Sequence, residues 1–272
     1  MGETIKKETI NILDVEVYCE HSISEKPPII LIHGFLASTF TYNQIVPNLS
    51  KQYSVLLVDL PGFGRSEKST TFNYSFENYT KLILAIMDHF KLESAFFVGH
   101  SMGGQVSLNV AKYAPDRVKK IVLLCSSGYL KKANRFLRYG SYLPLFHWYA
   151  YRYFQKKDVR GVMERVLYDH SLITNEMMEE YKRPLMEQDF YKSLLRLLRH
   201  REGDLSTEEL KQINTPTLLI WGKEDEIVPL KVGEKLNDDL PNSELVVYEK
   251  AGHLITDEKP KEVYEQIVEF AK

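Results

Sequence analysis

Short, almost wholly apolar runs recur along the 272-residue chain, and they constrain its fold more than any other feature. Runs this short, with both faces apolar, are typical of strands in a parallel sheet that helices cover on both sides. Helical patterns lie between them; Leu82, Ile83 and Ile86, for example, fall on one helical face. This alternation predicts an α/β doubly wound fold. The runs occupy residues 29–32, 55–58, 95–98, 121–124, 217–220 and 245–248.

The N-terminal region adds two further strands to the predicted sheet. Residues 9–13 and 15–19 alternate between apolar and polar side chains and are separated by Asp14, which predicts an antiparallel hairpin. With the six apolar runs, this predicts a mostly parallel eight-stranded sheet with helices on both faces. Folds of this class place their chemistry at the carboxyl ends of the strands.

One region interrupts the alternation of strands and helices. Residues 128–215 contain helical patterns and no strand-like run, and the region is too long for a simple connection. We therefore predict a core of residues 1–127 and 216–272, with 128–215 inserted as a helical cap. Ser206 and Glu209 have the spacing of a capping box, which predicts the start of the last helix before the sheet resumes.

A Gly-x-Ser-x-Gly motif lies between an apolar run and a helical pattern, at Gly99 to Gly103. This strand–turn–helix context is the one in which the motif positions a nucleophile, here Ser101. The turn is tight enough that only glycine fits at 99 and 103. Met102 N–H would lie at the helix start, directed at an oxyanion. The alternative is a loop that carries these residues by chance.

A serine nucleophile needs a base that removes its proton and an acid that orients the base. Asp225 follows one late apolar run and His253 follows the next, 28 residues further on. The order Ser101, Asp225, His253 is the one found in hydrolases of this architecture. Glu224 and Glu226 flank Asp225 and are rival acids.

Other side chains are weaker candidates for these roles. Ser126 and Ser127 stand after an earlier strand, where some relatives carry the acid, and neither can serve as one. His33 and His100 are interpreted as structural residues of their turns. The other histidines are interpreted as residues of the surface or of the insertion: His21, His89, His147, His170 and His200.

The second oxyanion donor is predicted at the end of the first parallel strand. Run 29–32 leads directly into His33, Gly34 and Phe35, and Gly34 allows a tight backbone turn. The Phe35 N–H then pairs with Met102 N–H, and a donor in such a hole contributes about 3 kcal/mol. A generic turn is the alternative.

Together these motifs resemble the α/β-hydrolase fold family, in the branch with esterases, epoxide hydrolases, dehalogenases and cofactor-free haloperoxidases. The chain is particularly similar to uncharacterised hydrolases of Gram-positive bacteria. Its relatives with epoxide hydrolase and haloalkane dehalogenase activity use a carboxylate nucleophile, so Ser101 argues against those chemistries. The resemblance implies that the loop 59–66 is mainly structural. The matching segments are 33–35, 59–66, 99–104, 221–225 and 252–253.

The predicted activity is hydrolysis of small or medium carboxylic esters through an acyl-enzyme, without a metal or organic cofactor. Three alternatives remain open. The same triad can cleave a carbon–carbon bond in vinylogous diketone acids, or catalyse cofactor-free perhydrolysis of the haloperoxidase type. The fold also serves as a ligand receptor or signalling partner in which hydrolysis is slow. Fold alone does not decide among them.

The start of the insertion is rich in aromatic and basic residues. Residues 129–160 hold eight Lys or Arg and one acid, Asp158. Three interpretations are open: aromatics packed on the sheet beneath a solvated basic face, a lining for an apolar substrate, or a face that contacts anionic lipid or a partner. Tyr129, Phe146 and Trp148 are predicted to bind substrate. The aromatics of 129–154 are Tyr129, Phe136, Tyr139, Tyr142, Phe146, Trp148, Tyr149, Tyr151, Tyr153 and Phe154.

Charge, apolar runs and cysteine content indicate where the protein is located and which kinds of partner it binds. The net charge of −2 gives no reason to expect a nucleic-acid partner. No run of about 18 apolar residues and no signal-like N-terminus occur, which predicts a cytoplasmic protein without stable membrane insertion. Cys19 and Cys125 lie in apolar runs and are predicted to be buried thiols. A monomer or homodimer acting on a small-molecule ester is expected.

Overall fold

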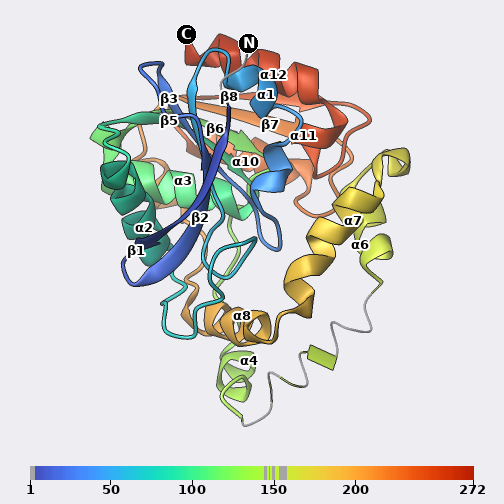
Figure 1. Ribbon diagram of the computed structural model, residues 1–272. Coiled ribbons are helices and arrows are strands. Elements are labelled where there is room, and N and C mark those ends of the chain that lie inside the picture. Colours follow the sequence, from blue (N-terminus) through green and yellow to red (C-terminus); the bar gives the residue numbers. More distant parts are fainter. Residues whose placement is uncertain (1–3, 144–145, 147, 149–150, 153–157) are drawn as a thin grey trace.

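Eight strands form one sheet in the order β1-β2-β4-β3-β5-β6-β7-β8 (Figure 1). The computed structural model describes residues 4–143, 146, 148, 151–152 and 158–272. The predicted α/β fold with a mostly parallel eight-stranded sheet is confirmed. The strands are β1 Lys6–Ile12, β2 Val15–His21, β3 Pro28–Ile32, β4 Ser54–Val58, β5 Ala95–His100, β6 Val118–Leu124, β7 Thr217–Gly222 and β8 Ser243–Tyr248.

Strand direction follows from how the connections are made. β1 and β2 pair antiparallel across a two-residue turn, in which Leu13 and Asp14 both have positive φ, at 51° and 59°. Positive φ at both positions is the geometry that matches the twist of a tight hairpin. β2 also pairs antiparallel with β4, whereas the pairs from β4 through β3 to β8 are parallel. The predicted hairpin is therefore confirmed.

The helices that cover the sheet come from the segments between its strands. α1 packs beside α12, α2 packs along α3, and α10 packs on β7 and β8 (Figure 1). α2 buries the predicted apolar face, including Leu82, Ile83 and Ile86. The helices are α1 Val46–Leu49, α2 Phe76–His89, α3 Met102–Tyr113, α10 Leu230–Asp239, α11 Ile255–Glu258 and α12 Pro260–Ala271.

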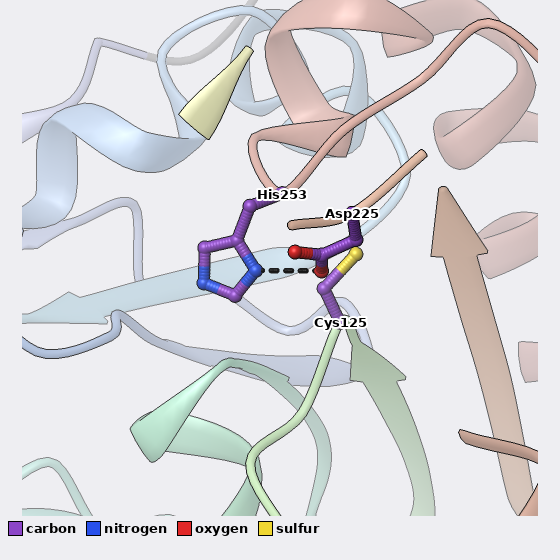
Figure 2. Close-up of side chains that lie close together, drawn as sticks. All are labelled: Cys125, Asp225 and His253. Carbon is purple, nitrogen blue, oxygen red and sulfur yellow. Dashed lines mark hydrogen bonds and ion pairs between the residues drawn. The ribbon is translucent and has the colours of Figure 1, made fainter. Parts of the chain in front are cut away.

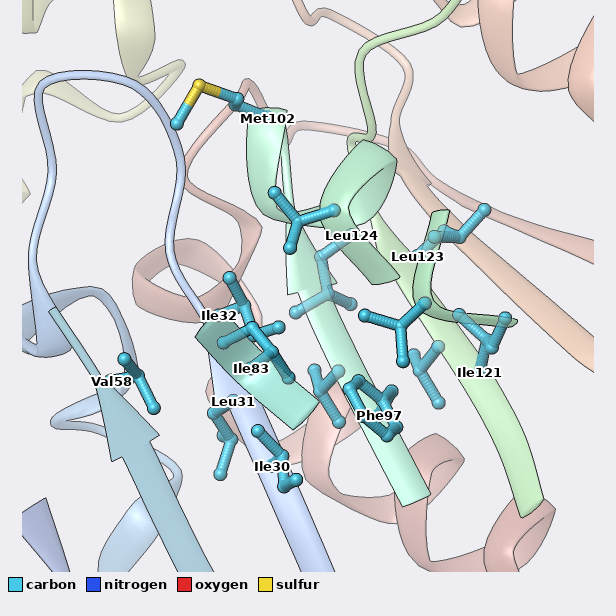
Figure 3. Packing of buried hydrophobic residues seen from close by; sticks show 14 of the residues in the cluster. Ile30, Leu31, Ile32, Val58, Ile83, Phe97, Met102, Ile121, Leu123 and Leu124 are labelled. Carbon is cyan, nitrogen blue, oxygen red and sulfur yellow. The ribbon is translucent and has the colours of Figure 1, made fainter. Parts of the chain in front are cut away.

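The core lies around the central parallel strands. Figure 3 shows Ile32, Phe97 and Leu124 packed among neighbours from adjacent strands and from α2. All three are fully buried, and β3, β5 and β6 bury residues on both faces. Full burial of such a side chain contributes about 1.5–3 kcal/mol, so this layer rigidly supports the strand ends.

Between β6 and β7 the described residues form helices and no strand. The Ser206 side chain and Glu209 make a reciprocal capping box at the start of α9, as the sequence predicts. The boundaries of the cap at 128 and 215 stay a prediction. These helices are α4 Arg135–Gly140, α6 Val159–Val166, α7 Asn175–Lys182, α8 Gln188–His200 and α9 Thr207–Leu210.

Polar contacts attach this helical region to the core. The Glu202 carboxylate accepts the N–H of Phe76 at 2.7 Å, at the start of α2. Arg65 and Glu180 form an ion pair at 2.6 Å, and Arg183 donates to the Gly64 carbonyl at 2.9 Å. These contacts fix the far end of α7 on the loop that follows β4, and the segment after α8 on the start of α2.

Neither cysteine takes part in a disulfide. Cys19 and Cys125 are both free and fully buried, as predicted. Within the described residues, no helix has the length and apolarity that crossing a bilayer requires.

Candidate active site

Ser101 stands at the turn between β5 and α3 in a conformation that L-residues rarely adopt, with φ of 51° and ψ of −117°. Strain of this kind costs about 1–3 kcal/mol and persists only where surrounding structure imposes it. The Ser101 N–H donates to the Leu124 carbonyl at 3.0 Å, and the Ser101 carbonyl accepts the N–H of Ser127 at 3.0 Å. The side chain is thus held at the carboxyl end of β5.

The glycines of this turn are required by close backbone packing. A Cβ at Gly99 would overlap the Gly103 carbonyl, and a Cβ at Gly103 would overlap the Ile32 carbonyl of β3. Both obstacles are backbone atoms, which cannot rotate away. The prediction that only glycine fits at 99 and 103 is therefore confirmed.

The structure brings Asp225 and His253 together, and Figure 2 shows the hydrogen bond that joins them. His253 Nδ1 lies 2.7 Å from Asp225 Oδ2, and both side chains are buried. Asp225 Oδ1 accepts the N–H groups of Ile227 at 2.8 Å and Val228 at 2.9 Å. These bonds hold the carboxylate in place, and its bond to His253 orients the imidazole with Nδ1 as the donor and Nε2 available as a base.

The two rival acids point elsewhere. The Glu224 carboxylate accepts the Ala251 N–H at 3.1 Å, and Glu226 forms an exposed ion pair with Arg165 at 3.8 Å. Of the three neighbouring acids, Asp225 is the one bonded to His253. The choice could not be made from spacing, because the turn after β7 sets the direction of each side chain.

The loop that carries His253 is held from two sides. His100, next to Ser101, has its Nε2 2.9 Å from the His253 carbonyl, so Nε2–H is the donor. Burial and the nearby His253 lower the pKa of His100 to about 3, so its ring is neutral. On the other side, the His253 N–H donates to the Val166 carbonyl at the end of α6 at 2.8 Å.

Glu258 connects the same loop to the helical region. One oxygen of its carboxylate accepts the Gly252 N–H at 2.6 Å. The other accepts the N–H groups of Tyr168 at 2.7 Å and Asp169 at 2.9 Å, which follow α6. Burial raises the pKa of Glu258, while these amide donors oppose the shift. A single carboxylate therefore ties the turn before His253 to the segment after α6.

Cys125 lies beside the Asp225–His253 pair, at the end of β6 (Figure 2). The three side chains have potential ligand atoms within 4.8 Å of one another, close enough to share a metal ion. Burial and the charge of Asp225 raise the pKa of the Cys125 thiol well above its usual range. Since Zn²⁺ binds the thiolate, a thiol held protonated is a poor ligand. The cluster fits a hydrogen-bonded network better than a metal centre.

His33 and Asp59 support the neighbouring turns. His33 Nε2 accepts the Leu60 N–H at 2.9 Å, so its Nδ1–H donates to the Gly34 carbonyl at 2.7 Å. Asp59 is fully buried and its oxygens accept the N–H groups of Thr39 and Arg65, both at 2.6 Å. Neither side chain contacts the Asp225–His253 pair in the described hydrogen bonds.

The two predicted oxyanion donors flank Ser101. Met102 is the first residue of α3, and Phe35 belongs to the loop directly after β3. That loop lies against the elbow, since a Cβ on Gly34 would stand 2.9 Å from the Ser101 Cβ. Ser101, Met102 and Phe35 line one common cavity.

This cavity has a volume of about 780 Å³ and is walled mainly by aliphatic side chains. Of the triad candidates, Ser101 is the one in its described lining. Arg201 is the ionisable side chain of that lining, and it is paired at 2.6 Å with Asp204, whose side chain is fully buried. The helical region, the loop after β7 and the start of α10 supply the apolar wall, namely Leu130, Leu137, Phe146, Leu194, Leu195, Leu197, Leu198, Ile227, Val228, Pro229 and Val232.

Of the three aromatic residues predicted to bind substrate, one lines the cavity and two lie elsewhere. Phe146 lines the cavity. Tyr129 instead packs on α10, where its hydroxyl donates to Asp239 at 2.7 Å. Trp148 is half-exposed beneath Arg152 and borders a separate, smaller cavity. Aromatic type alone could not separate these positions. Tyr149, Tyr153 and Phe154 lie outside the described residues.

Comparison with known proteins shows the family to which this chain belongs. The family described as alpha/beta hydrolase fold matches residues 27–260, most of the chain. The chain belongs to this family. It is 44% identical over 259 residues to the uncharacterized hydrolase YugF of Bacillus subtilis, and the match covers 95% of each chain. The predicted similarity to an uncharacterised hydrolase of a Gram-positive bacterium is confirmed.

Two solved structures resemble this α/β hydrolase along almost its whole length. One is a meta-cleavage product hydrolase from Pseudomonas fluorescens, with a TM-score of 0.79, 25% identity, and 97% of this chain and 96% of that chain covered. The other is a putative lipase from Acinetobacter baumannii, with a TM-score of 0.80, 26% identity, and coverage of 98% and 91%. Its structural relatives therefore include one named a meta-cleavage product hydrolase and one named a putative lipase.

Sequence reasoning missed three features of the site in this α/β hydrolase. Glu258 follows His253 by five residues and carried no signal beyond its charge. The contact between Val166 and His253 joins positions 87 residues apart through backbone atoms, which no residue type encodes. The aliphatic wall from α8 was missed because the prediction looked for aromatics.

Proposed function

We propose that this α/β hydrolase cleaves carboxylic esters with Ser101 as nucleophile, His253 as base and Asp225 as the acid that orients it. The observation that carries the proposal is the 2.7 Å hydrogen bond between His253 Nδ1 and Asp225 Oδ2. It leaves Nε2 as the proton acceptor, in a loop that His100 holds beside the strained Ser101.

The reaction follows from these roles in two steps. Ser101 Oγ attacks the ester carbonyl while His253 Nε2 takes its proton, and the Asp225 carboxylate stabilises the imidazolium. His253 then protonates the departing alkoxide, which leaves an acyl group on Ser101. Water attacks this acyl-enzyme while His253 Nε2 takes its proton, and His253 then returns that proton to Ser101 Oγ as the bond to the acyl group breaks and the carboxylic acid leaves.

The negative charge of each tetrahedral intermediate is assigned to two backbone donors. Met102 N–H lies at the first turn of α3, where the helix dipole favours an anion. Phe35 N–H lies on the loop that packs against Ser101. Because both donors are backbone groups held by packing, they need no reorganisation as charge develops.

The cavity favours an uncharged acyl chain as the group bound beside Ser101. Its walls are aliphatic, and the charge of Arg201 is already matched by Asp204. The dienoate anion that a meta-cleavage product hydrolase handles would need an unmatched cation to offset its desolvation. An apolar acyl group needs none, which supports ester hydrolysis over the carbon–carbon alternative.

A p-nitrophenyl ester series from C2 to C16 tests the proposal. We expect kcat/KM to rise about fourfold per added methylene until the cavity is filled, because each buried CH₂ contributes about 0.8 kcal/mol. Ser101→Ala should abolish turnover. If the wild type hydrolyses none of the esters, or Ser101→Ala keeps its activity, the proposal is wrong.

Two further measurements separate the alternatives. A fluorophosphonate probe should label the wild type, should fail to label His253→Ala, and should label the matched control His170→Ala, whose imidazole is exposed. A vinylogous 1,5-diketone acid should be cleaved far more slowly than the best ester. Faster cleavage of the diketone acid would make carbon–carbon hydrolysis the main activity.

A further inference from the structure

The residues in and around α4 expose an unusual amount of apolar surface. Five large apolar side chains are more than 60% exposed in the described part of the chain, and four of them lie within residues 136–143. These four are Phe136 at 73%, Tyr139 at 73%, Leu143 at 64% and Tyr142 at 63%. A contiguous exposed patch of this kind marks an interaction site more often than a bare surface.

The same segment is positively charged. Lys131, Lys132 and Arg135 are exposed, and Arg138 is partly exposed beside them. The stretch 129–143 contains no acidic residue. In the part of the chain that the structure describes, none of the four cations forms an ion pair. We call residues 131–143 the α4 surface.

The α4 surface adjoins the entrance of the catalytic cavity. Leu130 and Leu137 both line that cavity, and each is about half exposed to solvent. α4 lies beyond α8, on the side away from the sheet (Figure 1), and Arg199 of α8 donates to the Ser141 hydroxyl at 2.8 Å. A partner seated on the α4 surface would therefore face the opening that leads to Ser101.

We propose that the α4 surface docks on a lipid surface with anionic headgroups, so that the cavity opens toward the apolar phase in which acyl esters dissolve. Aromatic and aliphatic side chains would enter the interface, and the cations would face the headgroups. A second copy of the chain fits less well, because a symmetric contact would bring the same four cations together. Docking is peripheral and needs no spanning helix.

That the α4 surface binds lipid does not depend on the proposed function. That acyl esters then enter the cavity from the lipid rests on the proposed function. Ser101→Ala protein is therefore used for binding, so that vesicle lipids are not consumed. It is sedimented with vesicles of phosphatidylcholine alone and of phosphatidylcholine with 30% phosphatidylglycerol. We expect binding to the anionic vesicles, weak binding to the neutral ones, and loss of binding between 0.1 and 1 M salt.

Matched variants then locate the contact. Lys131→Glu with Lys132→Glu, in the Ser101→Ala background, should weaken partitioning at least 30-fold, at about one kcal/mol for each lost charge. Lys211→Glu with Lys231→Glu makes the same change in net charge on exposed lysines elsewhere and should bind nearly as wild type. Phe136→Ser with Tyr139→Ser should weaken binding without changing hydrolysis of a soluble butyrate ester.

Three outcomes would overturn the inference. The first is that the protein fails to bind anionic vesicles at low salt. The second is that the two charge-reversed double variants lose vesicle binding equally. The third is that the protein elutes as a dimer in size-exclusion chromatography and becomes monomeric in Phe136→Ser with Tyr139→Ser. Hydrolysis of soluble esters without vesicle binding would refute the docking and leave the proposed function intact. Vesicle binding without any ester hydrolysis would refute the proposed function and leave the docking intact.

Discussion

Glu258→Gln tests whether the helical region positions His253 through the carboxylate that joins them. The Glu258 carboxylate accepts the N–H groups of Gly252, Tyr168 and Asp169. An amide has one accepting oxygen. Glutamine can therefore accept either from Gly252 or from Tyr168 and Asp169, and its NH₂ group must face the remaining N–H. The variant preserves size and removes the bridge.

The magnitude follows from the number and kind of bonds. A hydrogen bond to a charged acceptor contributes about 1.5–3 kcal/mol, and a neutral one about 0.5–1.5 kcal/mol. One bond is lost and two become neutral, a cost of about 5 kcal/mol. Burial raises the pKa of Glu258, so removing its charge offsets part of this cost. We expect a net loss of about 2 kcal/mol in the free energy of unfolding.

The kinetic effect should exceed the effect on substrate binding. A shift of about 1 Å in a catalytic group can lower the rate about 100-fold. We expect kcat for a p-nitrophenyl ester to fall 10- to 100-fold in Glu258→Gln, with KM unchanged within about twofold. Urea unfolding and steady-state kinetics on the same preparation separate stability from positioning. Glu265→Gln, an exposed carboxylate on α12, is the matched control.

A folded Glu258→Gln enzyme with wild-type kcat would refute the positioning role. The same conclusion would follow if KM rose while kcat stayed constant, because that pattern indicates lost substrate contacts rather than a displaced base.

Three further perturbations test the fold and its charges. Burial raises the pKa of Asp257 from 3.8 to about 7, so the native state binds this proton more tightly than the unfolded state and stability falls between about pH 4 and pH 7. The shift corresponds to at most about 4 kcal/mol of stability. Asp257→Asn should therefore reduce the dependence of melting temperature on pH in this range. If that dependence is unchanged in the variant, Asp257 does not cause it. Gly103→Ala should yield no stable protein by thermal melting, because its Cβ would overlap backbone, whereas Gly140→Ala has open space and should be neutral or stabilise by up to about 1 kcal/mol. Ellman's reagent should leave Cys19 and Cys125 unmodified until urea unfolds the chain, since both thiols are buried and burial raises the pKa of each; rapid labelling of native protein would contradict this.

Local patterns determined much of this protein, because they act over one strand or one turn of helix. The six apolar runs and the two alternating N-terminal runs predicted the eight strands of the sheet, and the structure lengthened several of them by a few residues. The elbow at Ser101 was predictable for a similar reason, since its glycines are demanded by contacts within a strand–turn–helix unit. The order of Ser101, Asp225 and His253 followed from which strand each residue ends.

Contacts between distant segments decided the rest. The direction of three adjacent acids depends on the turn after β7, so only the structure joins Asp225 to His253 and turns Glu224 and Glu226 away. Tyr129 is a residue type expected in a substrate pocket, yet its hydroxyl donates a hydrogen bond to Asp239 on α10.

The sequence by itself therefore determined the sheet, the elbow and the class of chemistry, which depend on periodicity and steric exclusion along a short stretch of chain. Tertiary structure alone decided what surrounds Ser101. The aliphatic wall of the cavity and the bridge through Glu258 both arise from segments far apart in the chain. Their energies depend on burial and hydrogen bonding between those segments, which no local pattern records.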